Sequence, residues 1–187
     1  MTLAIADVPL FAQQFYFMRH GESAANLNDT IAGSLDVALT ECGHQQAMAA
    51  AKLLKSVGIA TIYSSALSRA RDTAGHIERT LGLPVTTIVE LAERNWGVLE
   101  GTPRALRAKG TTPPGGETPQ QYMDRVLQGL AKINPRGKVL IVAHSGVFRV
   151  LCRTLGLNEP DAPYRNAQPV RFEPPAEPGG AWRLESL

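Results

Sequence analysis

The sequence lacks the features that identify several large classes of protein. Its 187 residues include only two cysteines, Cys42 and Cys152, which lie far apart in stretches with helical patterning. Two such cysteines are poor material for a disulfide framework or a thiolate metal site, so we expect both to be reduced and packed. No run approaches the roughly 18 consecutive apolar residues of a membrane-spanning helix, and residues 1–14 lack the basic segment of a secretion signal. The sequence therefore predicts a cytoplasmic protein with no membrane partner.

The sequence also lacks a strong excess of charge of either sign. Its 19 Lys and Arg residues are opposed by 17 Asp and Glu residues, which leaves a formal net charge of +2 at pH 7. The basic residues are dispersed, so they do not form the basic stripe that nucleic acid binding requires, and no nucleic-acid partner is expected. We predict one domain over residues 1–187, with an N-terminal extension at 1–14 and a short lid segment at 102–117. The oligomeric state is unknown from the sequence.

Hydrophobic patterning predicts an alternation of strands and helices. Strands are expected at residues 15–18, 59–63, 85–89 and 138–144. Thr40 and Ser145 are expected to cap two of the helices, and Thr118 with Gln121 forms a capping-box pattern at the start of another. Two further apolar runs near the C-terminus predict an antiparallel hairpin. The pattern indicates an α/β protein, a three-layer α/β/α fold with a mostly parallel central sheet and an antiparallel edge strand.

Basic side chains follow three of the predicted strands directly. Arg19 and His20 end the first strand, Arg69 follows the second, and His144 ends the last. Because the carboxyl ends of parallel strands share one edge of a sheet, these residues are expected to meet there. Arginine binds oxyanions bidentately, and a neutral imidazole can attack phosphorus when its other nitrogen is held by an acceptor. The sequence therefore predicts a phosphate pocket.

Phosphoryl transfer in such a pocket does not require a metal or another cofactor. The arginines can neutralise the charge on the equatorial phosphate oxygens. No second His, Cys or carboxylate stands at ligand spacing from His20, so no metal site is expected. A carboxylic acid is still needed to protonate the leaving alkoxide.

Five motifs follow one another along the chain. They are Arg19-His20-Gly21-Glu22 followed by Asn26, Ser64-Ser65-Ala66-Leu67-Ser68-Arg69-Ala70, Leu91-Ala92-Glu93 with Gly97 and Gly101, Gly115-Gly116-Glu117-Thr118, and Val142-Ala143-His144-Ser145-Gly146. In this order they resemble the motifs of the histidine phosphatase superfamily, also called the phosphoglycerate mutase-like family. The resemblance covers about residues 15–172. One Arg-His-Gly would be weak evidence, but five ordered motifs leave little room for chance.

The resemblance implies a role for each matching residue. His20 would be the phosphorylated nucleophile, and Glu93 would donate a proton to the leaving group and then activate water. Glu90 and Glu100 are neighbouring carboxylates that compete with Glu93 for this assignment. The transferred phosphoryl group would be held by the catalytic residues Arg19, Arg69 and His144, with Asn26 and Ser145 beside it. The implied partner is a small phosphorylated substrate.

The acceptor of the phosphoryl group separates the functions within this family. A mutase must keep water out and needs a substantial cover over the site, whereas residues 102–117 form only a short Pro/Gly-rich segment. We therefore favour a phosphomonoester phosphatase. Phosphoglycerate mutase-type transfer and a non-catalytic module that binds phosphate or a phosphoprotein are the alternatives.

Other polar residues near the motifs are predicted to have structural or solvent-facing positions. Arg71 and Arg94 are expected to face solvent or form ion pairs, and Glu22 is expected to orient its motif by hydrogen bonds. His44 and His76 lie on helical stretches and are expected at the surface or its boundary. Arg104, Arg107 and Lys109 in the lid segment either form a solvated loop or meet a second anionic group on the substrate.

Overall fold

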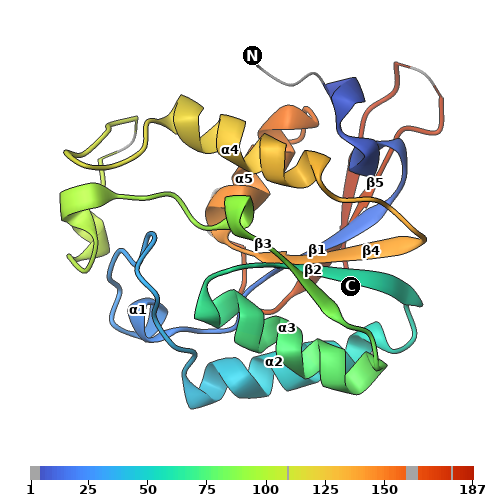
Figure 1. Ribbon diagram of the computed structural model, residues 1–187, viewed down its shortest axis with the longest axis horizontal. Coiled ribbons are helices and arrows are strands. Elements are labelled where there is room, and N and C mark those ends of the chain that lie inside the picture. The colour runs from blue at the N-terminus through green and yellow to red at the C-terminus, as the bar shows by residue number, and fades with distance from the viewer. Residues whose placement is uncertain (1–4, 109, 159–163, 178) are drawn as a thin grey trace.

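The computed structural model describes residues 5–108, 110–158, 164–177 and 179–187 (Figure 1). Its sheet has six strands in the order β3-β2-β4-β1-β5-β6. The strands are β1 (Phe15–Arg19), β2 (Ile59–Ser65), β3 (Val85–Ile88), β4 (Lys138–Ala143), β5 (Pro169–Glu173) and β6 (Arg183–Ser186). The first four are parallel to one another, while β5 and β6 run antiparallel along one edge. The predicted mostly parallel sheet is confirmed, and its antiparallel edge is a hairpin of two strands.

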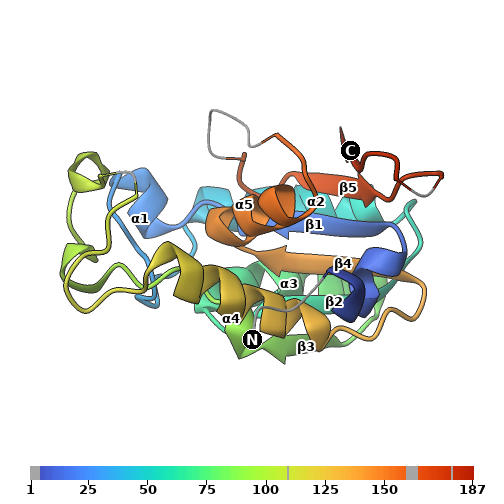
Figure 2. The same ribbon diagram turned by 90° about the horizontal axis from the view of Figure 1, so that it is seen from above.

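Helices cover both faces of this sheet (Figures 1 and 2). These are α2 (Glu41–Leu54), α3 (Ser68–Leu81), α4 (Pro119–Ala131) and α5 (Ser145–Thr154), while α1 (Ala24–Leu27) is a short helix that follows β1. The helices α2 and α3 pack on one face, and α4 and α5 pack on the other. The three-layer prediction is therefore confirmed. Among the described residues, no helix has both the length and the apolar character needed to cross a membrane.

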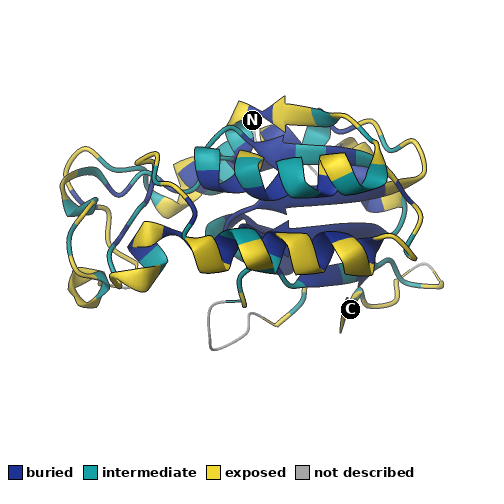
Figure 3. Ribbon diagram, turned by 90° about the horizontal axis from the view of Figure 1, so that it is seen from below, coloured by how far each residue is buried: buried dark blue, intermediate teal, exposed yellow. Residues whose placement is uncertain are grey.

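The central strands β1 and β4 are buried on both faces, which explains their unbroken apolar runs. In β1, Phe15 and Phe17 pack into the core cluster under α4 and α5. The alternate residues, Tyr16 and Met18, pack into the cluster under α2 and α3. Burial of each such side chain contributes roughly 1.5–3 kcal/mol to folding. Figure 3 shows the complementary pattern, with exposed residues on the outer faces of the helices.

Local side-chain hydrogen bonds decide where the helices begin. The Thr40 hydroxyl accepts a hydrogen bond from the backbone N–H of Gly43 at 3.0 Å, as predicted for the cap of α2. Thr118 and Gln121 form the predicted capping box of α4. The prediction that Ser145 caps α5 is wrong, because Ser145 is the first helical residue and its hydroxyl lies 3.4 Å from Glu93 Oε2.

The segment before β1 contributes to the core. Two 3-10 turns, Ile5–Asp7 and Pro9–Ala12, lead into the sheet. Leu10 and Phe11, within the second turn, are buried. The Phe11 ring packs against the ring of Trp182 with the centroids 6.2 Å apart. The segment therefore bridges α4 and the C-terminal hairpin.

The two cysteines are both free thiols, as predicted, but they differ in burial. Cys152 on α5 is fully buried in the core. Cys42 is exposed, so the prediction that it packs is wrong. It lies in the first turn of α2, on the side of the helix away from the buried Ala47, Ala51 and Leu54.

Candidate active site

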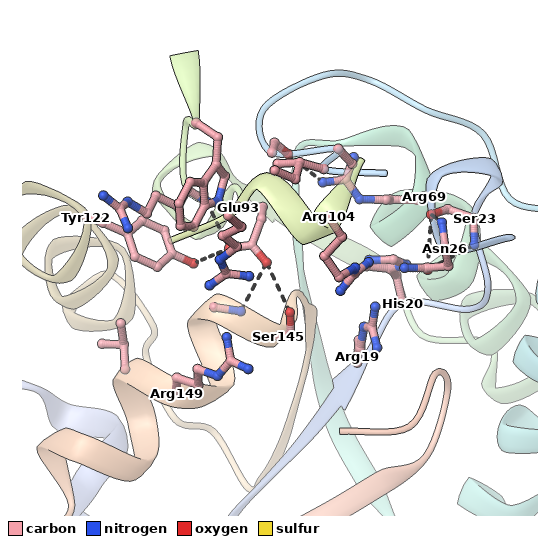
Figure 4. A pocket seen from close by; sticks show the side chains of 18 of the residues that line it. Arg19, His20, Ser23, Asn26, Arg69, Glu93, Arg104, Tyr122, Ser145 and Arg149 are labelled. Carbon is pink, nitrogen blue, oxygen red and sulfur yellow. Dashed lines mark hydrogen bonds between the residues drawn. The ribbon is translucent and has the colours of Figure 1, made fainter. Parts of the chain in front are cut away.

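The carboxyl edge of the parallel strands carries a cavity of about 170 Å³. All seven predicted site residues lie at this edge, and Figure 4 labels six of them. Arg19, His20, Asn26, Arg69, Glu93 and Ser145 line the cavity. His144 lies directly behind it, with its ring centroid 5.2 Å from that of His20. The two histidines meet because Arg19 at the end of β1 is in register with Ala143 at the end of β4.

The backbone holds the His20 ring in one tautomer. His20 is buried, and its Nδ1 lies 2.7 Å from the carbonyl oxygen of Gly21. A carbonyl can only accept, so Nδ1 carries the proton and Nε2 keeps its lone pair. Burial, and then the neighbouring His144 and Arg69, hold the pKa of His20 well below its ordinary value. The ring is therefore neutral at physiological pH and presents an unprotonated nitrogen.

His144 is oriented by a different partner. Its Nε2 lies 2.8 Å from the hydroxyl oxygen of Ser65, which itself accepts a hydrogen bond from the N–H of Leu67. We assign the Ser65 hydroxyl as the donor to His144 Nε2, and this assignment places the His144 proton on Nδ1. This buried Nδ1 has no hydrogen-bond partner among the described residues. Burial, followed by the charge of Arg69, holds the pKa of His144 well below its ordinary value.

Two buried arginines complete the inner part of the cavity. Arg19 donates to the carbonyl of Tyr164 at 3.0 Å, and Arg69 donates to the carbonyls of Gly33 at 2.8 Å and Leu35 at 2.7 Å. Burial lowers the pKa of Arg19 to about 10, despite the opposing effect of the Glu93 carboxylate, and burial also lowers the pKa of Arg69. Both guanidinium groups remain charged at neutral pH.

Three buried nitrogens in the inner part of the site lack a hydrogen-bond partner among the described residues. They are Nε of Arg19, Nε of Arg69 and Nδ1 of His144. An unpaired buried donor costs about 1–3 kcal/mol, and more when it is charged. A tetrahedral oxyanion offers several acceptors and two or more negative charges at once. The donor set therefore fits a phosphate group beside His20 Nε2.

Glu93 lies on the opposite side of the cavity and is held by donors on both oxygens. Its Oε1 accepts from the N–H of Arg94 at 2.9 Å and from the hydroxyl of Tyr122 at 3.0 Å. Its Oε2 accepts from the N–H of Gly146 at 3.0 Å. Burial alone would raise the pKa of Glu93, but these two backbone N–H groups, then Arg69, outweigh it, and the pKa is lowered. Glu93 is therefore a carboxylate in the free protein.

Glu90 and Glu100, the two neighbouring carboxylates, do not line the cavity, so neither occupies the position of Glu93. Glu90 pairs with Lys132 on α4. Glu100 accepts hydrogen bonds from the backbone N–H groups of Ser34 and Trp96. Among the described residues that line the cavity, Glu93 alone carries a carboxylate.

Asn26 is oriented by a network from distant parts of the chain. Its Oδ1 accepts from the N–H and the hydroxyl of Ser23, both at 3.1 Å, and from Nδ2 of Asn166, also at 3.1 Å. Three donors on the oxygen assign the amide orientation and leave Nδ2 of Asn26 as a donor toward the cavity. Asn166 also donates to the carbonyl of His20 at 2.8 Å.

Close backbone packing supports the strand-end motif from behind. A Cβ atom on Gly43 would lie 2.0 Å from the carbonyl oxygen of Glu22, and one on Gly21 would lie 2.4 Å from the carbonyl oxygen of Gly43. Only glycine permits this approach. The Glu22 carboxylate accepts from Thr40 at 2.7 Å, so the predicted orienting role of Glu22 is confirmed.

The structure corrects one prediction and places the other polar residues. Arg94 is buried, not solvent-facing, and donates to the carbonyls of Glu117 and Thr111. Arg71 is exposed as predicted. His44 and His76 are half-buried on α2 and α3, with His44 Nδ1 3.0 Å from His76 Nε2. Lys109 lies outside the described residues.

Four residues at the site were missed from the sequence. They are Trp96, Tyr122, Arg149 and Asn166. Tyr122 was predicted as a core residue of α4, and helical spacing gave no indication that its hydroxyl reaches Glu93. Arg149 stands one helical turn after Ser145, a spacing that places both on one side of α5. No sequence signal marked Asn166.

Comparison with known proteins finds one family model and several similar sequences. The sequence model described as "Histidine phosphatase superfamily (branch 1)" matches residues 15–171. The chain is 35% identical over 150 residues to the uncharacterized phosphatase PhoE of Bacillus subtilis, covering 77% of this chain and 78% of PhoE. It is 36% identical over 160 residues to the probable phosphoglycerate mutase GpmB of Salmonella typhi, covering 76% and 74%.

Solved structures resemble most of the chain. A mycobacterial glucosyl-3-phosphoglycerate phosphatase solved with VO3 has a TM-score of 0.75 and 27% identity, covering 93% of this chain and 98% of the other. A protein from Thermus thermophilus has a TM-score of 0.73 and 27% identity, covering 93% and 99%.

Proposed function

The chain belongs to the histidine phosphatase superfamily, and from this premise we propose that it is a phosphomonoester phosphatase that works through a phosphohistidine intermediate. One observation carries the proposal. The unprotonated Nε2 of His20 lies among buried donors without partners, opposite a half-buried carboxylate. This arrangement supplies a nucleophile, charge stabilisation and a proton carrier, which are the three requirements of the reaction. The relatives named as phosphatases support the same assignment.

In the first step, the lone pair of His20 Nε2 attacks phosphorus, and the bond from phosphorus to the ester oxygen breaks. The proton of the Glu93 carboxyl group passes to the departing oxygen, so that the product leaves as an alcohol. Arg19, Arg69 and the Nδ1–H of His144 stabilise the charge on the transferred phosphoryl oxygens. The step ends with a phosphorus–nitrogen bond on His20 and an ionised Glu93.

Glu93 acquires its proton when the substrate binds. The carboxylate is ionised in the free protein, but a phosphoryl group placed opposite it introduces further negative charge. Two anionic groups close together in a poorly hydrated site favour protonation of one of them. Binding of the substrate is therefore coupled to uptake of one proton.

In the second step, water replaces the alcohol. The Glu93 carboxylate takes a proton from water, the water oxygen attacks phosphorus, and the phosphorus–nitrogen bond breaks. Inorganic phosphate leaves, and His20 regains its lone pair on Nε2. The Glu93 carboxyl is protonated again, which balances the proton given up in the first step.

The short lid segment favours water over a metabolite as the phosphoryl acceptor. Arg104–Leu106 forms only a single 3-10 turn, and residues 105–108 are exposed. A mutase requires a cover that keeps water from the phosphohistidine. Mutase-type transfer remains the second candidate because GpmB, at 36% identity, is named a probable phosphoglycerate mutase.

A hydrolysis assay tests the proposal. We expect turnover of p-nitrophenyl phosphate and of small phosphate esters in the presence of EDTA, and loss of turnover in His20→Ala. An acid-labile phosphoryl adduct should be trapped on the wild-type protein. Absence of both turnover and adduct would favour a phosphate-binding module. Phosphate exchange on 3-phosphoglycerate, dependent on added 2,3-bisphosphoglycerate and faster than hydrolysis, would favour the mutase.

A further inference from the structure

The segment at residues 164–167, shortly before β5, holds the end of β1 from outside the cavity. The Arg19 side chain donates to the carbonyl of Tyr164 at 3.0 Å, and the Arg19 carbonyl accepts from the N–H of Ala167 at 2.9 Å. All four residues of the segment are described, and none of them lines the cavity. The segment therefore supports the end of β1 without forming part of the pocket wall.

The segment is fixed by its own packing. The Tyr164 ring packs against the ring of Phe148 on α5 with the centroids 4.8 Å apart, and Ala167 is buried in the core cluster under α2 and α3. The φ angle of Ala167 is 50°, in the left-handed region where a Cβ atom is unfavourable. Such strain persists only where the surrounding contacts over-determine it, and it is concentrated at functional sites. The strained turn places the preceding residue, Asn166, against the motif.

Asn166 uses both hydrogens of its side-chain amide. Its Nδ2 lies 2.8 Å from the carbonyl oxygen of His20 and 3.1 Å from Oδ1 of Asn26. His20 is the first residue after β1, and its N–H donates to the carbonyl of Ala143 at 2.9 Å. Strand pairing ends there, because Arg19 and Ala143 are the last pair between β1 and β4. Asn166 therefore holds the His20 carbonyl beyond the sheet and fixes the backbone that carries the imidazole.

The same amide discriminates between the two orientations of Asn26, which lies beside His20 and Ser23 (Figure 4). A half-turn of the Asn26 amide would exchange its Oδ1 and Nδ2. Its Nδ2 would then face two groups that can only donate, the N–H of Ser23 and Nδ2 of Asn166. Asn166 cannot turn to relieve this contact, because its own oxygen would then meet the His20 carbonyl. The observed orientation keeps Nδ2 of Asn26 as a donor toward the cavity.

We propose that Asn166 is a positioning residue for the reaction, which fixes the backbone of His20 and the amide of Asn26 and does not contact the phosphoryl group. Its effect through His20 belongs to the attack on phosphorus, because displacing a reacting group by about 1 Å can cost about 10²-fold in rate. Its effect through Asn26 belongs to binding, because only one orientation presents a donor to an anion. The identities of the nucleophile and of the bound group rest on the proposed function.

A double-substitution cycle tests the effect on binding. Calorimetry measures the affinity for inorganic phosphate of the wild-type protein, Asn26→Ala, Asn166→Ala and the double variant. We expect Asn26→Ala to weaken binding about tenfold or more, as loss of one charge-assisted hydrogen bond does, and Asn166→Ala to weaken it at least about fivefold. In the Asn26→Ala background, Asn166→Ala should weaken binding by less than about twofold further. Losses that multiply would show that Asn166 does not act through Asn26.

Steady-state kinetics test the effect on the nucleophile. Asn166→Ala should lower kcat for p-nitrophenyl phosphate at least about tenfold, in addition to the rise in KM that weaker binding causes. Asn166→Leu keeps the branched shape of the side chain but has no donor, so it should lower kcat by a similar factor. A residue with only a structural role would lower the midpoint of urea denaturation and leave the kcat of the folded protein unchanged.

Asn134→Ala is the matched control for both measurements. Asn134 is exposed and precedes β4, at the end of that strand opposite to the cavity. The control should leave the affinity for phosphate and kcat within about twofold of the wild-type values.

The binding cycle needs no turnover, so it separates this proposal from the proposed function. A protein that shows the coupling between Asn166 and Asn26 but hydrolyses nothing would support Asn166 as a positioning residue and remove the phosphatase assignment. Losses of affinity that multiply, or a wild-type kcat in folded Asn166→Leu, would overturn the proposal even if hydrolysis is rapid. A wild-type protein that binds no phosphate would overturn both.

Discussion

At the scale of single residues, the buried position of the His20 ring predicts how activity responds to acid. Burial holds the pKa of His20 well below its ordinary value, so the neutral nucleophile persists as the pH falls below 6.5. An imidazole with the ordinary pKa would be about nine-tenths protonated at pH 5.5.

We therefore expect kcat for p-nitrophenyl phosphate at pH 5.5 to be at least half its value at pH 7. A pH–rate profile in steps of half a unit measures it. A decline centred near pH 6.5 that follows protonation of a single group would contradict the neutral, buried ring.

Substitution of Glu93 gives a second prediction, for which substitution of Glu90 is the control. Glu93→Gln removes the proposed proton carrier, and general acid catalysis contributes about 10²–10⁴ in rate. We expect a loss of kcat in this range for an alkyl phosphate and a smaller loss for p-nitrophenyl phosphate, whose leaving group needs less protonation. Glu90→Gln should change kcat less than twofold, because Glu90 pairs with Lys132 outside the cavity. Equal losses in the two variants would remove Glu93 from the mechanism.

At the scale of elements, one arginine of α4 holds the loop that carries Glu93. Arg125 donates to the carbonyls of Glu90 at 2.8 Å and Ala92 at 3.1 Å, and it forms a bidentate pair with Glu117 in which both distances are 2.7 Å. Through Arg125, the α4 helix therefore holds the loop that positions Glu93.

Arg125→Gln should lower kcat about tenfold or more and destabilise the protein by about 1–3 kcal/mol, because partly buried acceptors lose their donor. Arg125→Lys should restore part of the stability, but less of kcat, because an ammonium group cannot reproduce the planar fork. Urea denaturation and steady-state kinetics measure the two effects. Unchanged kcat in a correctly folded Arg125→Gln protein would show that the loop keeps its position without this contact.

The packing of α2 against the strand-end motif gives another element-scale prediction. Gly43→Ala would place a Cβ atom 2.0 Å from the carbonyl of Glu22, so the helix and the motif must move apart. We expect a loss of at least about 1 kcal/mol in stability and a fall in kcat.

Gly75→Ala on α3 is the matched control for Gly43→Ala. The nearest atom to its Cβ would be a flexible end of Arg79 at 3.5 Å. This substitution should stabilise the protein by up to about 1 kcal/mol through helix propensity. Equal effects at the two positions would contradict the steric argument.

At the scale of the whole molecule, parallel-sheet topology explains why so much of the site follows from the sequence. Arg19, Arg69 and His144 come after three different strands, and the rule that parallel strands share a carboxyl edge is enough to bring them together. The residues that were missed are of another kind. Tyr122 contributes through a hydroxyl direction that periodicity does not contain. Asn166 acts across 146 and 140 residues of sequence, on His20 and Asn26, and only the folded path of the chain reveals such a contact.

The position of β1 in the sheet determines when the site can form during synthesis of the chain. This strand is the first in the chain, but its two neighbours are β4 and β5, and the segment at 164–167 binds the Arg19 side chain and backbone. A growing chain therefore carries its histidine motif beside a strand with two open edges until most of translation is complete. Long-range pairing of this kind folds slowly. We expect the phosphate pocket to be absent from every nascent chain that ends before residue 167, so that the enzyme acquires affinity for phosphate late and in a single step.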